Sequence, residues 1–231
     1  MNSNSLLLNL LNKFSHLFHF LNEYTDLKNL WMTTPGLWNS DERRFLCFLE
    51  LSKSKSIKYW KSKEFRAYTI SRVSDPSKQI FLNLSGCKRI TDVSSLGSVH
   101  ILDLSECQGI TDVSSLGNVH RLYLSYCRGI TDVSSLGNVN TLDLYGCQGI
   151  TDVSSLGNVH ELYLARCNGI TDVSSLGNVH ELDLSECNAI TDVSSLGNVH
   201  TLDLSKCQGI TNVSSLGNVQ KLKGSFFVRV I

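Results

Sequence analysis

The sequence of 231 residues lacks a net charge, a phosphate-binding loop, a paired-cysteine motif and a recognisable catalytic set. Serine, histidine and aspartate are abundant, but each recurs in its own register, so stacking would place them in separate parallel files without forming a unique pocket. We therefore predict a protein that is not an enzyme and needs no cofactor. The charge is unevenly distributed, because residues 1–79 carry a net +5 and residues 80–231 a net −5. Such a split suggests two modules with different partners.

A long apolar run is also missing. The most apolar stretch, residues 6–21, is short for a membrane span and contains Asn, Lys and His. No basic residue precedes it, Lys13 interrupts it and no small-residue cleavage site follows it, which is not the pattern of a signal peptide. We expect an amphipathic helix of a soluble protein and no membrane span.

In place of these motifs the sequence has a 20-residue repeat, present seven times. Position 1 of each copy is a leucine: Leu82, Leu102, Leu122, Leu142, Leu162, Leu182 and Leu202. The copies read L-x-L-x-x-C-x-x-I-T-D-V-S-S-L-G-N-V-H-x with few departures. Apolar residues therefore recur at positions 1, 3, 6, 9, 12, 15 and 18.

This spacing predicts the shape of each copy. Positions 1 and 3 alternate as on one face of a short strand, and every third residue after them is apolar, as in turns or 3₁₀ segments around a core. Positions 9–18 leave no room for a long helix. Each copy should be one coil whose apolar edge is buried only by its neighbours. The predicted fold class is an α/β solenoid with a parallel sheet on one side, turns or 3₁₀ segments on the other, and a small helical N-terminal module.

Three nearly constant positions have structural explanations. Glycine at position 16 is expected at a left-handed or tight corner. Cysteine at position 6 should fill a core corner, because seven thiols on one line cannot converge as the four ligands of zinc. Aspartate at position 11 should cap the next turn by accepting a backbone N–H, whereas a calcium ladder would need glycine-rich, doubly acidic loops.

Histidine at position 19 is typical of a hydrogen-bonding edge residue, because Asn140 and Gln220 replace it in two copies. We expect no metal site there. Stacked imidazoles repel each other once they are protonated, so the pKa values of these histidines should lie below the free value of about 6.5.

The repeats resemble a known family. The segments LNLSGCKRITD (82–92) and LDLSECQGITD (102–112) resemble leucine-rich repeats of the cysteine-containing kind, and ITDVSSLGNV is similar to the short repeats of internalin-type proteins. Cysteine-containing repeats are usually longer and carry a convex helix, for which 20 residues leave no room. The resemblance implies ligand binding on the concave, strand-bearing side. Such repeats are common in F-box/leucine-rich-repeat substrate receptors of cullin-based ubiquitin ligases, and the near-identity of the copies resembles repeat arrays of large DNA viruses of amoebae.

Residues 1–79 do not repeat and are predicted to form a helical module, with helices near 6–21, 25–34, 40–51 and 57–68. This module is either a solenoid cap or F-box-like. The segment LFHFLNEYTDLKNL (17–30) is similar to the middle of the F-box motif, although the leading Leu-Pro is missing. In the F-box interpretation a Skp-type adaptor would contact Leu17, Phe18, Leu21, Leu27 and Leu30, which otherwise form the module's own core. The solenoid should span residues 80–221, followed by a cap strand at 222–231.

A run of lysines lies in the same module, at Lys53, Lys55, Lys58, Lys61 and Lys63. Such a run attracts nucleic acid or anionic lipid in some proteins, and a solvated helix face explains it equally well. Seven acidic residues share the module, so we do not favour nucleic acid as a partner.

The copies differ mainly at positions 20, 2, 4, 5, 7 and 8. Positions 20, 2 and 4 should face outward from the sheet, with position 5 beside them. The predicted partner-binding residues are Asp103, Glu106, Arg121, Tyr123, Tyr126, Asp143, Tyr145, Glu161, Tyr163, Arg166, Glu181, Asp183, Glu186, Asp203 and Lys206. Drift after duplication is the alternative explanation. It should also reach the exposed threonine and serine positions (10, 13 and 14), which do not vary, so we favour a binding face.

Acidic residues with tyrosines set among them suit a basic or mixed-charge protein segment. We therefore predict a non-enzymatic protein-binding protein. In one interpretation it is a substrate-recognition adaptor that recruits a Skp-type adaptor and a cullin through its N-terminal module. In the other it is a general recognition scaffold or a surface or secreted adhesion-type binder, with glycans at Asn83 and Asn212 and paired cysteines. The periodic cysteines favour a reducing compartment, cytoplasmic or nuclear, or the host cytoplasm if the protein is viral.

Overall fold

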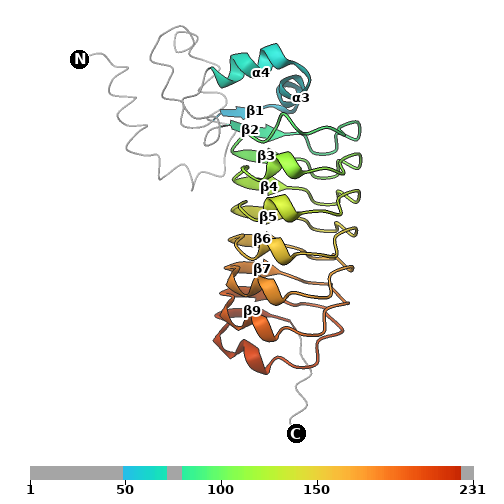
Figure 1. Ribbon diagram of the computed structural model, residues 1–231, viewed down its shortest axis with the longest axis vertical. Helices are drawn as coiled ribbons and strands as arrows, with labels where there is room; N and C mark the ends of the chain where they lie inside the picture. The colour runs from blue at the N-terminus through green and yellow to red at the C-terminus, as the bar shows by residue number, and fades with distance from the viewer. Residues whose placement is uncertain (1–48, 72–79, 225–231) are drawn as a thin grey trace, which may run out of the picture. The chain divides into compact units, whose positions relative to one another are not determined.

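The computed structural model describes residues 49–71 and 80–224, which belong to one compact unit, Phe45–Ile231. In this part of the chain a single sheet of nine parallel strands runs in sequence order (Figure 1). The strands are β1 (Leu49–Leu51), β2 (Ile80–Asn83), β3 (Ile101–Asp103), β4 (Arg121–Tyr123), β5 (Thr141–Asp143), β6 (Glu161–Tyr163), β7 (Glu181–Asp183), β8 (Thr201–Asp203) and β9 (Lys221–Lys223).

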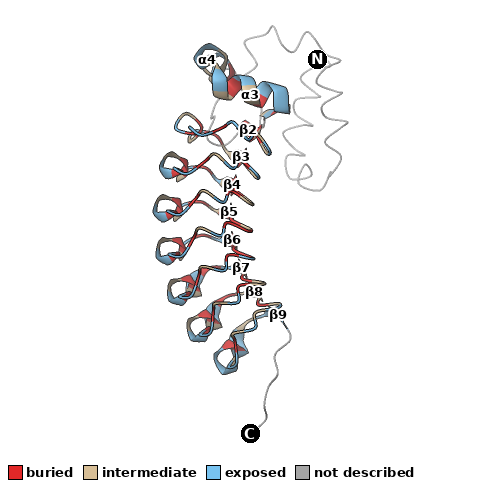
Figure 2. Ribbon diagram, turned by 90° about the vertical axis from the view of Figure 1, so that its right-hand side faces the viewer, coloured by how far each residue is buried: buried red, intermediate tan, exposed pale blue. Residues whose placement is uncertain are grey.

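The coils return on the opposite side through short 3₁₀ segments. These are η3 (Ser114–Leu116), η4 (Ser134–Leu136), η5 (Ser154–Leu156), η6 (Ser174–Asn178), η7 (Ser194–Asn198) and η8 (Ser214–Asn218). Figure 2 shows the strands along one side of the stack, on the inside of its curve, and the 3₁₀ segments along the other. The predicted solenoid, with a parallel sheet on one side and 3₁₀ turns on the other, is confirmed.

The core is one continuous cluster built from the predicted positions. Leucines at position 1 pair in register from coil to coil, as in Leu122 with Leu142, and are buried. In the central coils all seven apolar positions are buried, whereas towards the C-terminal end of the stack the exposed fraction rises, to 38% at Leu222 in β9. Each coil therefore buries its apolar edge against its neighbours, as the spacing predicts.

The cysteines at position 6 belong to this core. From Cys107 to Cys207, each thiol donates to the backbone carbonyl of the position-3 leucine in the preceding coil, as Cys147 Sγ does to Leu124 O at 3.1 Å. Burial raises the pKa of Cys107 to about 11 and that of Cys127 to about 12. The five thiols from Cys107 to Cys187 are buried and free, so the structure uses them as core side chains.

The structure explains the constant glycine at position 16 by something other than a left-handed backbone. Gly137 has φ −62° and ψ −15°, which is right-handed backbone. A Cβ atom at Gly137 would collide with the carbonyl oxygen of Ser155 in the next coil. The glycine is needed because two backbones approach closely. Of the two alternatives expected here, a left-handed or a tight corner, the left-handed one was wrong.

Within residues 49–71, two helices precede the first coil, α3 (Lys53–Lys61) and α4 (Lys63–Ile70). The sequence predicted one helix over 57–68. The chain instead breaks at Ser62, whose hydroxyl accepts the N–H of Phe65 and caps α4. Residues 49–51, expected to end a helix, form β1, because they pair with β2 and continue the sheet.

The two helices cover the end of the solenoid. Tyr59 is fully buried against the core, Trp60 Nε1 donates to Asp92 O at 2.8 Å, and Arg66 donates to Ser95 Oγ at 3.1 Å. The five lysines of the run lie on exposed faces of α3 and at the start of α4. The five residues predicted to contact a Skp-type adaptor lie outside the described residues, as does most of the predicted C-terminal cap strand.

No helix in the described ranges, 49–71 and 80–224, has the length and apolar character needed to cross a membrane.

The close approach at position 16 makes a direct prediction. Gly137→Ala should lower the free energy of unfolding by about 1–3 kcal/mol, because the added methyl forces two coils apart. The matched control is Gly217→Ala in the last coil, where an added Cβ meets nothing within 4 Å and stability should change by less than about 0.5 kcal/mol. Urea denaturation of both variants measures the difference, and equal destabilisation would contradict the explanation.

Candidate functional site: the strand face and its rim

The strand face consists of the outward side chains of β3 to β8. Their register forms two parallel files, with the buried leucines between them. The file at position 20 is Ile101, Arg121, Thr141, Glu161, Glu181 and Thr201, and the file at position 2 is Asp103, Tyr123, Asp143, Tyr163, Asp183 and Asp203. The structure thus brings together on one surface the residues that the sequence predicted for these positions.

Hydrogen bonds cross from coil to coil on this face. Thr141 Oγ1 donates to Glu161 Oε2 at 3.1 Å, and Tyr163 OH donates to Glu181 Oε1 at 3.1 Å. Burial and then the charge of Glu181 raise the pKa of Tyr163, so this phenol remains a donor at neutral pH. The result is a half-buried tyrosine held among carboxylates.

The aspartates at position 2 also have a structural task that the sequence reasoning missed. In each, Oδ1 accepts the backbone N–H two residues on, as from Tyr145 N to Asp143 Oδ1 at 2.8 Å and from Ser185 N to Asp183 Oδ1 at 2.8 Å. Asn83 accepts the corresponding N–H in the first coil at 3.2 Å. Where the cap forms, it uses an Asp or Asn side-chain oxygen but not its charge, and Tyr123 and Tyr163 occupy the same position in the other two coils. The presence of Asn83 at this position was the available signal.

The rim lies beside the strand face at positions 4 and 5 and consists of Glu106, Tyr126, Tyr145, Arg166, Glu186 and Lys206. Position 5 has left-handed backbone in every one of these coils, with φ between 60° and 62° at its five non-glycine residues. The conformation turns the N–H toward the next coil, as from Glu106 N to Ser125 O at 2.7 Å. Only two copies place glycine there, Gly86 and Gly146, so most copies keep a side chain against strain of about 1–2 kcal/mol.

The rim side chains also contact one another. The rings of Tyr126 and Tyr145 meet edge to face with centroids 5.0 Å apart, and the Arg166 guanidinium lies 5.6 Å from the Tyr145 ring. Arg166 Nε and Lys206 Nζ each lie 2.8 Å from a carboxylate oxygen of Glu186. These hydrogen bonds, that of Lys206 first, lower the pKa of Glu186. The rim therefore presents an aromatic cluster followed by an ordered sequence of charges.

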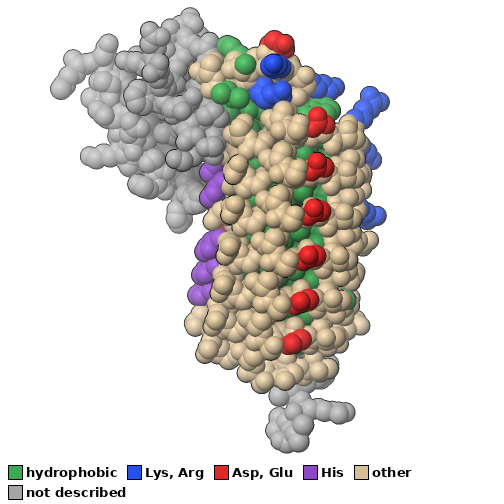
Figure 3. All heavy atoms as spheres, viewed as in Figure 1, with side chains coloured by type: hydrophobic (Ala, Val, Ile, Leu, Met, Phe, Trp, Pro, Cys, Tyr) green, Lys and Arg blue, Asp and Glu red, His purple; other side chains and the backbone are tan. Residues whose placement is uncertain are grey.

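The aspartates of position 11 lie on a different side of the coils, where Figure 3 shows acidic side chains in a single file. Each accepts the N–H of the serine two residues on, as from Ser134 N to Asp132 Oδ1 at 2.9 Å, and Asn212 accepts from Ser214 N at 3.0 Å. These hydrogen bonds lower the pKa of Asp132. The capping role predicted for this position is confirmed.

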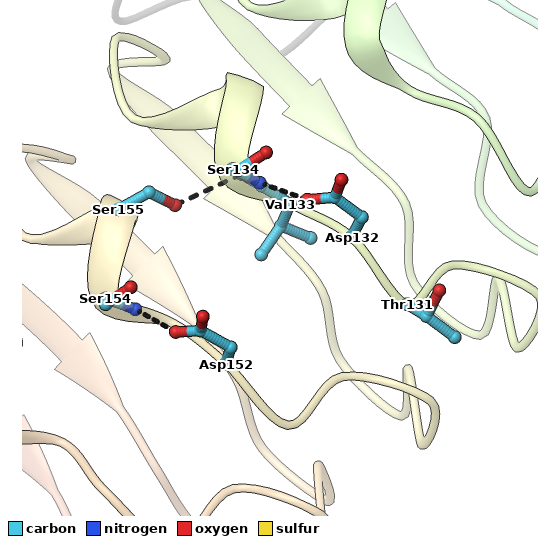
Figure 4. Close-up of a pocket in the computed structure, with 7 residues that line it drawn as sticks. All are labelled: Thr131, Asp132, Val133, Ser134, Asp152, Ser154 and Ser155. Atoms are coloured by element: carbon cyan, nitrogen blue, oxygen red, sulfur yellow. Dashed lines mark hydrogen bonds between the residues drawn. The ribbon is translucent and has the colours of Figure 1, made fainter.

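A small hollow lies between successive coils beside this file. One, of about 220 Å³, is lined by Thr131, Asp132, Val133, Ser134, Asp152, Ser154 and Ser155 (Figure 4). An equivalent hollow of about 230 Å³ follows one coil further on. Because successive coils repeat the same polar lining, these hollows make no unique pocket.

The constant positions of the repeat have structural partners. The second serine donates to the preceding coil, as Ser135 Oγ does to Val113 O at 3.4 Å. A Cβ added at Gly129 would lie 3.2 Å from Thr111 Cγ2, so the position-10 threonine packs against the next coil. Constancy of the threonine and of the second serine therefore follows from coil stacking, so at these two positions it is no evidence for a binding face.

The histidines at position 19 form two stacks. The ring centroids of His100 and His120, of His160 and His180, and of His180 and His200 are each 4.6 Å apart, with the rings nearly parallel. Burial, then His100 and Arg121, lower the pKa of His120, against an opposing effect of Glu161. In the part of the chain that the structure describes, no group of three or more His, Cys, Asp or Glu side chains is arranged to hold a metal ion.

Comparison with known proteins places the fold. No family model and no curated protein matches the chain. Among solved structures, an internalin from Listeria monocytogenes, InlF, is 24% identical with a TM-score of 0.52, over 65% of this chain and 48% of InlF. This chain thus spans about half of that structure. The likeness shows a leucine-rich repeat fold, as the repeats implied.

Two further structures are similar at lower TM-scores. Internalin C2 from the same organism is 26% identical, with a TM-score of 0.48, over 63% of this chain and 70% of its own. The leucine-rich repeat-containing protein LegL7 from Legionella pneumophila is 16% identical, with a TM-score of 0.45, over 78% of this chain and 74% of its own.

The histidine stack predicts a pH dependence. Because folding lowers the pKa of His120, the unfolded chain binds more protons, so the free energy of unfolding should fall as the pH drops below about 6.5. His120→Asn should reduce this fall, since Asn140 occupies the same position in the next coil. Urea denaturation between pH 7 and pH 5 tests it, and identical pH profiles for the two proteins would contradict the prediction.

Proposed function

We propose that this protein is a non-enzymatic scaffold that binds a segment of another protein on its strand face and rim. The observation that carries the proposal is the left-handed backbone at position 5. Five side chains other than glycine occupy it, although Gly86 and Gly146 demonstrate that glycine serves the fold there. Residues held in strained conformations cluster at functional sites, which supports a role for these side chains beyond the fold.

The charge of the surface supports a basic or mixed-charge segment as the partner. Of the fifteen partner-binding residues predicted from the sequence, eight are acidic and three are basic, which gives a net charge of −5. The tyrosines among them supply contact area with little loss of conformational entropy. A partner segment with an excess of Lys and Arg would neutralise this surface and pack its side-chain stems on the rings.

A finer form of the proposal is a substrate-recognition adaptor of a ubiquitin ligase. It rests on the F-box-like residues 17–30, which lie outside the described residues. In the sequence these residues precede β1, whereas α3 and α4 pack on the first coil. The alternative is a general recognition scaffold, or a surface or secreted adhesion-type binder, without a ubiquitin link. The free, buried thiols support a reducing compartment, the cytoplasm or nucleus, over the surface or secreted form.

The proposal predicts that substitutions at the rim weaken binding without lowering the stability of the fold. Peptides that bind the protein are first selected from a random dodecapeptide phage library. A variant with Tyr126→Gly, Arg166→Gly and Lys206→Gly should keep its free energy of unfolding within about 1 kcal/mol, because relief of backbone strain offsets the lost surface contacts. Its affinity for the selected peptides should fall at least about tenfold, a loss near 1.4 kcal/mol.

The control is Asp132→Asn with Asp152→Asn in the file of position-11 aspartates, away from the strand face. Asparagine keeps the turn caps there, as Asn212 does. This variant should bind normally. Unchanged affinity of the rim variant, or a library that yields no binder, would contradict the proposal.

The adaptor form has its own test. The full chain, expressed with an affinity tag in eukaryotic cells, should co-purify with a Skp-type adaptor and a cullin. Recovery of neither would contradict the adaptor form and leave the recognition scaffold in place.

A further inference from the structure

At position 2 the strand face repeats every two coils between β3 and β7, and Asn83 and Asp203 lie outside this alternation. Along position 2, register pairs link Asp103, Tyr123, Asp143, Tyr163 and Asp183 in sequence, so aspartate and tyrosine alternate. Neighbouring parallel strands lie about 4.8 Å apart. Chemically equivalent side chains therefore recur about every 9.6 Å along the stack.

This period discriminates between the conformations of a bound peptide that runs along the stack. A polyproline II segment returns to the same face every three residues, or about 9.3 Å, which misses the coil period by about 0.3 Å. An α-helix returns after seven residues, or about 10.5 Å, and a β-strand after two, or about 6.7 Å. The repeat of the helix therefore differs from the two-coil period by about 0.9 Å, and the repeat of the strand differs from it by about 2.9 Å.

The width of the face also favours an extended segment over a helix. Each strand of the face contributes three residues, so positions 20 and 2 stand only about 6.7 Å apart. A helix with its side chains is about 10–12 Å wide. A narrow extended segment can contact both files at once.

The chemistry of the two alternating side chains defines the sequence of the segment. Each aspartate holds Oδ1 on its own backbone turn, which fixes the carboxylate on the face. Asp143 Oδ2 also accepts from Ser125 Oγ at 2.6 Å, and the carboxylate keeps its negative charge. The tyrosine rings lie between them, and aromatic-lined grooves are the usual sites for proline-rich segments. Basic side chains at every third residue would meet Asp103, Asp143 and Asp183, and the two residues between them would lie over Tyr123 and Tyr163.

We propose that the strand face binds a polyproline II segment with Lys or Arg at every third residue, running along the coil stack. This inference rests on the proposed function, since it names the partner of the same surface. Three basic residues, spread over seven positions, span the four coil steps from Asp103 to Asp183.

Two fluorescent peptides of identical composition test the period against the full chain. One is (Lys-Pro-Pro)₅, and its isomer places the five lysines at every second position and the remaining prolines after them. Fluorescence anisotropy at an ionic strength of about 0.15 M should give at least a tenfold lower Kd for the first peptide, because only its charges match the aspartates.

Matched variants then locate the binding. Asp143→Asn with Asp183→Asn removes two charges and keeps the turns, as Asn83 does in the first coil. It should weaken (Lys-Pro-Pro)₅ at least tenfold. Asp132→Asn with Asp152→Asn makes the same change in charge in the position-11 file and should leave the affinity unchanged.

The outcomes separate the two proposals. Equal Kd values for the two isomers, or equal effects of the two variants, would overturn the two-coil period. If neither peptide binds while library-selected peptides do, the period is also overturned and the proposed function stands. If nothing binds in either experiment, both proposals fail.

Discussion

The structure depends on one backbone contact that repeats once in each coil. The N–H at position 3 donates to the carbonyl at position 2 of the next coil, as from Leu124 to Asp143 at 2.8 Å and from Leu144 to Tyr163 at 2.8 Å. This contact fixes the register, and a shift of one residue would turn the leucines outward. The repeat must therefore keep 20 residues, and every other ladder of the molecule is a consequence of that length.

The register also divides the positions of the repeat into fixed and free ones. Cysteine, threonine, the second serine and the position-16 glycine each touch the neighbouring coil, so any change in one copy disturbs the next. The outward positions of the strands and the rim make fewer obligatory contacts, and there the copies differ. Variation alone is therefore weak evidence for a ligand. The stronger evidence is that Tyr126 and Arg166 persist in a left-handed conformation that Gly146 satisfies without strain.

The sequence predicted the coil, the inward positions and the aspartate caps, because apolar spacing and Asp–Ser turns are local patterns that recur in every copy. It did not predict β1 or the break at Ser62, since those depend on packing against the first coil. Nor did it reveal that the left-handed position is 5 and not 16. Glycine is constant at position 16 because a carbonyl of the next coil lies against it, and only three-dimensional stacking distinguishes that cause from a positive φ.

The most direct test of this account is amide hydrogen exchange at position 3, measured residue by residue in the full chain. The N–H groups of Leu104, Leu124, Leu144, Leu164 and Leu184 each donate to the next coil at 2.8–2.9 Å. We expect strong protection of all five N–H groups, lost together on unfolding, because each hydrogen bond forms only when the next coil is stacked on its own coil. Exchange at the rate of an unstructured peptide at these leucines would contradict it.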